Sequence, residues 1–388
     1  MTAASRVPTM RVALVASSYE PHVGGVEQHV RSIAREFVGR GIDVEVWTVD
    51  RGERLGDQLV DGIRVRYLPT PLPARDARAL AGFVKRFPRA WRRWRQASEQ
   101  FRPDLLHVHC FGPNGLYALT LHRRLGIPLA VTSHGETLGD DTGVFTRSAL
   151  LRRGLREAIE RSVFVTAPSR FVLDGLRAYG LTEGAVVSNG VDPDVGPPGA
   201  LTETETYILG VGRLGRMKGF DLLIDAFARS GLANDHRLVI GGDGPERDSL
   251  ERHATACGLQ NRVRFVGQLA PAEVASAMAG ARLVAVPSRT EAFGIVALET
   301  WRAGTALVMT SHGGAAEFVR DNRDGLLVDP TDVAAFAEAL RAVATDDALR
   351  DRLAAAGRCR VTEFSWGAVA DGYLEHYAGV HTQGALRA

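Results

Sequence analysis

The strongest constraint on the fold is a repeated alternation of short apolar, β-branched segments with helical segments. Between the first two apolar segments, five apolar residues recur at helical spacing: Val26, Val30, Ile33, Ala34 and Phe37. The strand candidates in the first half of the chain span residues 11–17, 43–49, 63–69, 105–110, 128–134, 163–169 and 185–190. Strands that are apolar along their whole length predict a parallel sheet covered by helices on both faces.

The alternation stops once and then restarts. Residues 192–206, "DPDVGPPGALTETET", are rich in Pro, Gly and Thr and predict a linker. A second set of strand candidates follows, at residues 207–213, 237–244, 263–269, 283–289, 306–311 and 325–330. The fold class predicted is therefore α/β, with two doubly wound, Rossmann-like domains facing each other across a cleft. We expect the domains to span residues 1–191, of which 1–9 are expected to be disordered, and residues 207–365.

Bulk properties narrow the class of protein. A chain of 388 residues with 45% hydrophobic residues is too long for one ordinary core. Its formal net charge of +2 does not favour nucleic acid as a partner. The three cysteines, Cys110, Cys257 and Cys359, lie far apart without a CxxC pair, which indicates neither a disulfide framework nor a zinc site. Without a signal-peptide or membrane-spanning pattern, we expect a soluble cytoplasmic protein.

In doubly wound sheets, ligands bind beyond the carboxyl ends of the strands, so the loops there are the places to look for chemistry. The stretch "GVGRLGRMKGFDLLIDAF" places Arg213 and Lys218 around a glycine-rich turn. Two cations there could hold a diphosphate and stabilise the charge of a departing nucleoside diphosphate. Surface loops also carry such residues without a ligand. The turn "GGDGP", with Gly242, lacks GxGxxG spacing and indicates a tight turn first and a ligand contact second.

A second stretch, "RTEAFGIVALETWRAG", is more specific. It places Glu291 just before a helix that begins near Gly294, where the unpaired amides of Ile295 and Val296 would attract an anion. Glu299, eight residues after the first carboxylate, could accept hydrogen bonds from both hydroxyls of a ribose. The alternative is an exposed helical glutamate, which is the usual explanation for a lone residue. It accounts less well for the first carboxylate and the glycine.

The first domain offers weaker signals. Gly24 and Gly25 lie at the first strand-to-helix turn, where the backbone could approach a phosphate or sugar, or simply form a tight turn with positive φ. His134 ends a strand and would face the cleft, although a lone histidine is more often structural. Next to it, three acidic residues could contact a cationic acceptor or belong to a solvated loop: Glu136, Asp140 and Asp141.

Five motifs together resemble the family-4 retaining glycosyltransferases (GT4) with the GT-B fold: "GGVEQHV", "NGVD", "GRLGRMKGFDLLIDAF", "GGDGP" and "EAFGIVALE". They occur in that family's order, and the last contains its E-x7-E pattern. The resemblance implies that Arg213 and Lys218 neutralise the donor diphosphate and that Glu299 holds the ribose. Glu291 would lie beside the transferred sugar and serve as electrostatic support or position the sugar, not as an attacking base. One departure is Ala292, which adds a methyl group where many relatives have glycine.

The resemblance also implies roles for the remaining positions. Gly25 would close the site from the first domain, and His134 would lie near a distal sugar hydroxyl and the acceptor. The segment containing Val266 would line the base pocket, and residues 366–388 would return to the N-terminal, acceptor-binding domain as a helix. The implied donor contacts are Gly24, Gly25, Gly212, Arg213, Lys218, Gly242, Val266, Glu291, Phe293, Gly294, Ile295, Val296 and Glu299.

These observations predict a retaining glycosyltransferase with a nucleotide-sugar as co-substrate, UDP-GlcNAc or UDP-glucose favoured, and no metal or other cofactor. The acceptor predicted is a hydroxyl of a small molecule or natural product, such as an aminocyclitol in antibiotic biosynthesis. One alternative is a GDP-mannose-dependent mannosyltransferase acting on phospholipid or polysaccharide. Another is a non-catalytic nucleotide-sugar binder. A nicotinamide oxidoreductase is disfavoured, because the first strand turn lacks GxGxxG.

The segment "FVKRFPRAWRRWRQ" raises a separate question. Phe83, Phe87, Trp91 and Trp94 recur at helical spacing among six Lys and Arg residues. This pattern favours a helix that packs its aromatic stripe on the first domain, with Pro88 interrupting or starting it. Contact with an anionic membrane or with an acidic acceptor are the alternatives, and peripheral membrane contact is possible but not favoured.

Overall fold

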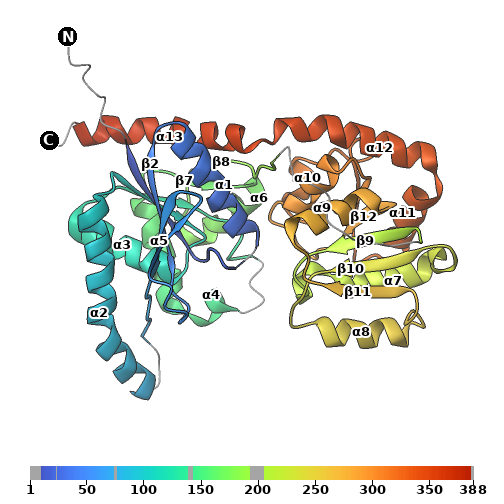
Figure 1. Cartoon of the computed structure of the whole chain (residues 1–388), viewed down its shortest axis with the longest axis horizontal. Coiled ribbons are helices and arrows are strands. Elements are labelled where there is room, and N and C mark those ends of the chain that lie inside the picture. Colours follow the sequence, from blue (N-terminus) through green and yellow to red (C-terminus); the bar gives the residue numbers. More distant parts are fainter. Residues whose placement is uncertain (1–9, 23, 74–76, 139–142, 193–204, 386–388) are drawn as a thin grey trace, which may run out of the picture. The chain divides into compact units, whose positions relative to one another are not determined.

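The computed structural model describes residues 10–22, 24–73, 77–138, 143–192 and 205–385, and Figure 1 shows its helices and strands. The chain divides into two compact units, one made of residues 1–187 and 366–388 and the other of residues 188–365. Both are α/β units with a largely parallel sheet, which confirms the predicted fold class. Asp140, Asp141, residues 1–9 and most of the predicted linker lie outside the described residues. Among the helices described, none is long and apolar enough to cross a membrane.

The first unit is built on an eight-stranded sheet with the order β3-β4-β2-β1-β5-β6-β7-β8. The strands are β1 (Arg11–Ala16), β2 (Asp43–Val49), β3 (Asp57–Val60), β4 (Ile63–Leu68), β5 (Leu105–His109), β6 (Leu129–Thr132), β7 (Val165–Ala167) and β8 (Ala185–Val186). The helices are α1 (Gly25–Gly39), α2 (Ala77–Phe101), α3 (Pro113–Leu125), α4 (Val144–Arg147), α5 (Ala149–Arg161), α6 (Arg170–Leu176), the 3₁₀ turn η1 (Arg177–Tyr179) and α13 (Trp366–Ala385). All pairs are parallel except the edge pair β3–β4. The sequence did not predict β3, because this strand has only four residues, begins with two polar ones and is mostly exposed.

Helix α13 closes the core of the first unit. The apolar face predicted for α1 is buried, with Phe37 fully inside, where its ring lies 5.3 Å from that of Tyr377 on α13. Two hydroxyls of α13 also reach buried histidines. Tyr377 bonds His107 Nδ1 at 2.6 Å, and Tyr373 bonds His29 Nε2 at 2.9 Å. The last helix thus belongs to the core of the first unit, although it follows the second unit in sequence.

The position of Pro88 in helix α2 differs from the prediction. The helix runs through Pro88 without interruption, whereas we expected the proline to interrupt or start it. Proline removes one backbone N–H and crowds the carbonyl four residues earlier, here that of Val84. Val84 is exposed, so water can bond the freed carbonyl. The apolar stripe also continues on both sides of Pro88 and holds the two halves in one helix.

The second unit is a six-stranded parallel sheet with the order β11-β10-β9-β12-β13-β14. Its strands are β9 (Tyr207–Val211), β10 (Arg237–Gly241), β11 (Val263–Gly267), β12 (Leu283–Val286), β13 (Leu307–Thr310) and β14 (Leu326–Val328). Its α-helices are α7 (Phe220–Ser230), α8 (Arg247–Ala256), α9 (Pro271–Gly280), α10 (Ile295–Arg302), α11 (Val333–Thr345) and α12 (Asp347–Arg360), and its 3₁₀ turns are η2 (Arg216–Lys218), η3 (Leu232–Asn234), η4 (Gly314–Glu317) and η5 (Val361–Glu363). The strand order reverses between β9 and β12, and in the first unit between β1 and β5. A ligand crevice in such a sheet forms at this reversal.

Candidate functional site

In the second unit, the loops after β9 and β12 are fastened to each other beside the reversal. The backbone amide of Arg289 donates to the carbonyl of Met217 at 2.8 Å, and its guanidinium makes two bonds to the Asp221 carboxylate. Gly219 sits between these loops with φ +66°, and a Cβ there would overlap the carbonyl oxygen of Pro287. Only glycine permits this approach, because it combines the left-handed conformation with the absence of a side chain.

These fastened loops bring Lys218 and Glu291 together. Lys218 Nζ donates to Glu291 Oε2 at 2.7 Å, and the Ser288 hydroxyl donates to the same oxygen at 2.8 Å. The Glu291 side chain is only 11% exposed, whereas the lysine side chain is 38% exposed. A buried carboxylate needs such a partner, and its loss would leave an uncompensated charge. The lysine can therefore hold the glutamate while part of its surface remains available to a ligand.

Helix α10 begins next to this ion pair. Its N-cap, Gly294, has φ +99° and no side-chain cap, so the first amides, at Ile295 and Val296, have no side chain bonded at the cap. A Cβ on Gly294 would overlap the Met309 side chain and lie 3.2 Å from Glu291 Cγ. The helix start and the carboxylate are thus immediate neighbours. An uncapped helix N-terminus beside a lysine is a favourable environment for a phosphate.

The glycine-rich turns after β9 and β10 lie backbone against backbone. Gly212 N donates to Gly241 O at 3.0 Å, and Leu214 N donates to Asp243 O at 2.9 Å. A Cβ on Gly242, where φ is +127°, would overlap the carbonyl oxygen of Gly212. The glycines in these turns are therefore explained by the close approach of the two loops. Between them, Arg213 is exposed, and its guanidinium makes no ion pair with any described residue.

The remaining donor-side positions of the second unit differ in accessibility. Phe293 is buried and stacks on Phe318 with ring centroids 4.2 Å apart, so only its backbone is open to a ligand. Val266 is partly buried at the irregular point of the β10–β11 register. Glu299 is the fifth residue of α10, and burial raises its pKa although the charge of Arg302 lowers it. A carboxylate held in this way gains from hydrogen bonds with hydroxyl donors.

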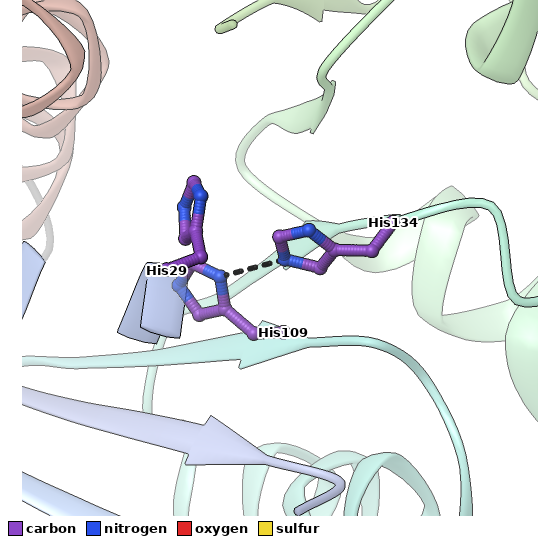
Figure 2. Close-up of side chains that lie close together, drawn as sticks. All are labelled: His29, His109 and His134. Carbon is purple, nitrogen blue, oxygen red and sulfur yellow. Dashed lines mark hydrogen bonds between the residues drawn. The ribbon is translucent and has the colours of Figure 1, made fainter. Parts of the chain in front are cut away.

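The first unit presents a different group at the carboxyl ends of its strands, a cluster of histidines (Figure 2). His109 ends β5, and its Nδ1 lies 3.3 Å from Nε2 of His134, which follows β6. His29, on α1, has its ring centroid 4.7 Å from that of His134. Burial lowers the pKa of His109 and of His134 well below the usual range, and neighbouring histidines lower both further. The imidazoles of His109 and His134 are therefore neutral hydrogen-bonding groups at neutral pH.

Two further predicted positions lie in the same unit. Gly24 is exposed and extended, with φ −179°, and it precedes Gly25, the first residue of α1. The tight turn with positive φ that we considered as an alternative is therefore wrong for Gly24, and any residue could adopt its conformation. A Cβ there would meet only the flexible Glu27 side chain.

Glu136, considered as an acceptor contact, is partly buried and already bonded inside its own loop. Its carboxylate accepts from the amides of Phe111 at 2.8 Å and His134 at 2.7 Å, and from the Ser133 hydroxyl at 2.8 Å. Burial raises the pKa of Glu136, while these bonds lower it. In this position Glu136 fixes the backbone that carries His134.

Comparison with known proteins identifies the family. A family model described as "Glycosyl transferases group 1" matches residues 197–360, and one described as "Glycosyltransferase Family 4" matches residues 23–195. The D-inositol 3-phosphate glycosyltransferase of Nocardioides sp. is 30% identical, covering 95% of this chain and 90% of that protein. The chain belongs to the family-4 glycosyltransferases. This glycosyltransferase is an enzyme that uses a nucleotide-sugar, and the retaining mechanism of the family applies to it.

Solved structures show that the glycosyltransferase has the GT-B fold. Sucrose-phosphate synthase from Thermosynechococcus elongatus superposes with a TM-score of 0.81 at 24% identity, covering 96% of this chain and 100% of that chain. Anabaena HepE in complex with UDP-glucose superposes with a TM-score of 0.75 at 20% identity, covering 95% of this chain and 100% of that chain.

Three members of these groups were not predicted from the sequence. His29 and His109 were not singled out, although His109 ends the strand "LLHVH" and His29 lies about one turn after Gly25. A signal was available, since polar residues at the carboxyl end of an apolar parallel strand are unusual. Ser288 gave none, because its bond to the Glu291 carboxylate depends on how the loop after β12 folds back.

Proposed function

We propose that this glycosyltransferase transfers a hexose from a UDP-sugar, UDP-GlcNAc or UDP-glucose, to a hydroxyl of a small polyol acceptor of the cyclitol class. The proposal rests mainly on one observation: the Lys218–Glu291 pair lies beside the uncapped start of α10. A diphosphate needs several positive or hydrogen-donating groups within one small volume, and these elements supply them.

In the proposed complex, the diphosphate accepts bonds from Arg213, Lys218 and the amides of Ile295 and Val296. The bond between the sugar C1 and the phosphate oxygen breaks, and a bond from the acceptor oxygen to C1 forms on the same face. The acceptor proton passes to the departing phosphate oxygen. Arg213 and Lys218 stabilise the negative charge that grows on that phosphate, which is where catalysis gains most from a fixed cation.

Glu291 has a supporting role in this scheme. Its carboxylate oxygen is held by Lys218 and Ser288, so it orients the lysine and places negative charge next to a sugar that becomes positive. Glu299 is proposed to accept the ribose hydroxyls. In the first unit, the neutral His134 and the exposed backbone of Gly24 and Gly25 are proposed as contacts for the sugar and the acceptor.

The choice of donor and acceptor class draws on the relatives. HepE is a protein solved with UDP-glucose, and the Nocardioides protein is named for an inositol phosphate. A neutral or phosphorylated cyclitol is preferred to an aminocyclitol here, because the Glu136 carboxylate is bonded within its loop.

Two measurements test the proposal. In a thermal-shift screen of UDP, GDP, ADP and NAD, UDP should raise the melting temperature most, because a ligand that binds only the folded state stabilises it. Incubation with a UDP-hexose and a panel of cyclitols should then give a glycoside whose anomeric configuration by NMR matches that of the donor. Stabilisation by GDP alone, with mannose transferred, would support the mannosyltransferase instead. Donor binding without turnover on any acceptor would support the non-catalytic binder.

A further inference from the structure

Helix α2 changes its environment halfway along its length. A single apolar stripe runs along the helix at spacings of three and four residues. In the second half this stripe packs on the first unit. Trp94 is fully buried, donates from Nε1 to the carbonyl of Pro69 at 3.1 Å, and packs against Trp47 and Tyr117. This half confirms that the aromatic stripe packs on the first domain.

The first half of the same stripe is only partly covered, since the Phe87 ring lies 6.2 Å from that of Tyr117. Leu80, Val84 and Phe87 occupy positions i, i+4 and i+7, and they are 43%, 62% and 36% exposed. Phe83 packs only partly, with its ring 5.2 Å from that of Phe87. A contiguous exposed apolar ridge on one helix indicates a binding surface, since isolated exposed apolar residues do not form such a row. Figure 1 shows α2 as one long helix at the edge of the first unit.

The charge around this ridge is of one sign. Residues 77–98 contain seven basic and no acidic residues, whereas the whole chain has a net charge of only +2. The rest of the chain is therefore net negative. Within the described part of the chain, four exposed cations of the first half form no ion pair with a carboxylate: Arg78, Lys85, Arg86 and Arg89. These side chains are free to meet an anionic partner.

We propose that the first half of α2, residues 78–89, docks on an anionic lipid surface. The helix would lie in the headgroup layer, with Leu80, Val84 and Phe87 inserted and the basic side chains among the lipid phosphates. A second copy of the chain is a poor occupant, because it would bring the same seven positive charges to the contact. This inference is independent of the sugar chemistry proposed above.

The test is co-sedimentation of the full-length protein with vesicles of phosphatidylcholine alone or mixed with phosphatidylglycerol. We expect binding only to the anionic vesicles, weakened by high salt. The triple substitution Leu80→Ser, Val84→Ser, Phe87→Ser should lower the partition coefficient about tenfold. Replacing Lys85, Arg86 and Arg89 by Glu should lower it about a hundredfold, since each basic residue near an anionic surface contributes about a fivefold gain.

A matched control uses exposed apolar residues elsewhere in the same unit. Leu59→Ser, Leu125→Ser and Val186→Ser together should leave the partition coefficient within about twofold of the wild type. Stabilisation by UDP should be unchanged in all three variants, which separates this test from that of the sugar chemistry. Equal binding to both kinds of vesicle, or no effect of the Leu80, Val84 and Phe87 substitutions, would overturn the proposal. So would a concentration-dependent dimer that those three substitutions abolish.

Discussion

The two sheets reverse their strand order in the same way, but the side chains at the two reversals differ. Charged groups lie there in the second unit, and histidines lie there in the first. In the second unit, the loops after β9 and β12 hold a lysine, a buried carboxylate and an uncapped helix start. In the first unit, the corresponding region holds the histidine cluster, in which burial keeps His109 and His134 uncharged at neutral pH. The ring of His107 packs against that of His109, and burial lowers the pKa of His107 to about 3. Topology therefore determines where a ligand can bind, and the side chains at that place determine which part of the ligand is suited to it.

The difference has a physical basis. A charged ligand group requires an opposite charge that is already in place in the protein. In the second unit the positive charge of Lys218 is in place, and Glu291 balances it while no ligand is bound. Hydroxyl groups of a sugar or acceptor require neutral donors and acceptors, which imidazoles provide. We therefore expect substitutions in the second unit to affect the donor diphosphate and substitutions in the first unit to affect the step that involves the acceptor.

The largest effect is expected at the cations. Lys218→Ala and Arg213→Ala should each lower kcat/KM by about 30- to 1000-fold, equivalent to about 2–4 kcal/mol of transition-state stabilisation. Arg216→Ala is the matched control, because Arg216 lies in the same loop, is exposed, and contributes its carbonyl to the bond with Arg289. Steady-state kinetics measure this, and an unchanged kcat/KM in Lys218→Ala and Arg213→Ala would exclude the assignment.

The next effect concerns the glycine that allows the two loops to meet. Gly219 and Gly231 flank helix α7, and both adopt positive φ, but only Gly219 has a backbone carbonyl where its Cβ would fall. Gly231→Ala should cost about 1–2 kcal/mol in free energy of unfolding. Gly219→Ala should cost about 1–3 kcal/mol more and weaken UDP binding. Urea denaturation of both variants measures the difference, and equal costs would show that the loops do not need this close approach.

A smaller effect is expected in the first unit. His134→Ala should lower kcat about 10- to 100-fold, because a buried hydrogen-bonding group loses its partner. The dissociation constant for UDP should stay unchanged. His122→Ala is the control, since the His122 ring is hydrogen-bonded to the carbonyl of Ile127 near the end of α3. If His134→Ala weakens UDP binding as strongly as it lowers kcat, the division of roles between the two units fails.

The protonation of Glu299 should make the stability of the protein depend on pH. Burial raises its pKa in the folded protein, so the folded state binds its proton more tightly than the unfolded state does. The stability contributed by this proton is present below the ordinary pKa of a glutamate and is lost as the pH rises through the raised value. Glu299→Gln should therefore be more stable than the wild type at neutral pH, while KM for the donor rises about tenfold. Thermal melts from pH 4 to pH 8 check this, and a stability gap that does not widen with pH would contradict it.

The smallest effect is expected from removing metal ions. Fixed cations supply the positive charge in the proposed complex, so initial rates in EDTA should stay within about twofold of those without it. Complete loss of activity in EDTA, restored by a divalent ion, would show that the cations of the second unit are not sufficient.

The sequence predicted much of the fold because the central strands are apolar along their whole length. It missed β3, a four-residue strand that pairs at an exposed edge, and it misplaced Pro88, which lies within α2. The candidate site was predicted in part, since glycine-rich turns after strands identify the loops. The bond from Lys218 to Glu291 could not be predicted, because it joins residues 73 positions apart. Its existence depends on the approach that Gly219 allows.

The most direct test of the proposed diphosphate site is a crystal structure of the protein with UDP. We predict that diphosphate oxygens lie within about 3.2 Å of the Arg213 guanidinium, of Lys218 Nζ and of the amides of Ile295 and Val296. A diphosphate bound away from all of these groups, with the Lys218–Glu291 pair undisturbed and distant, would contradict it.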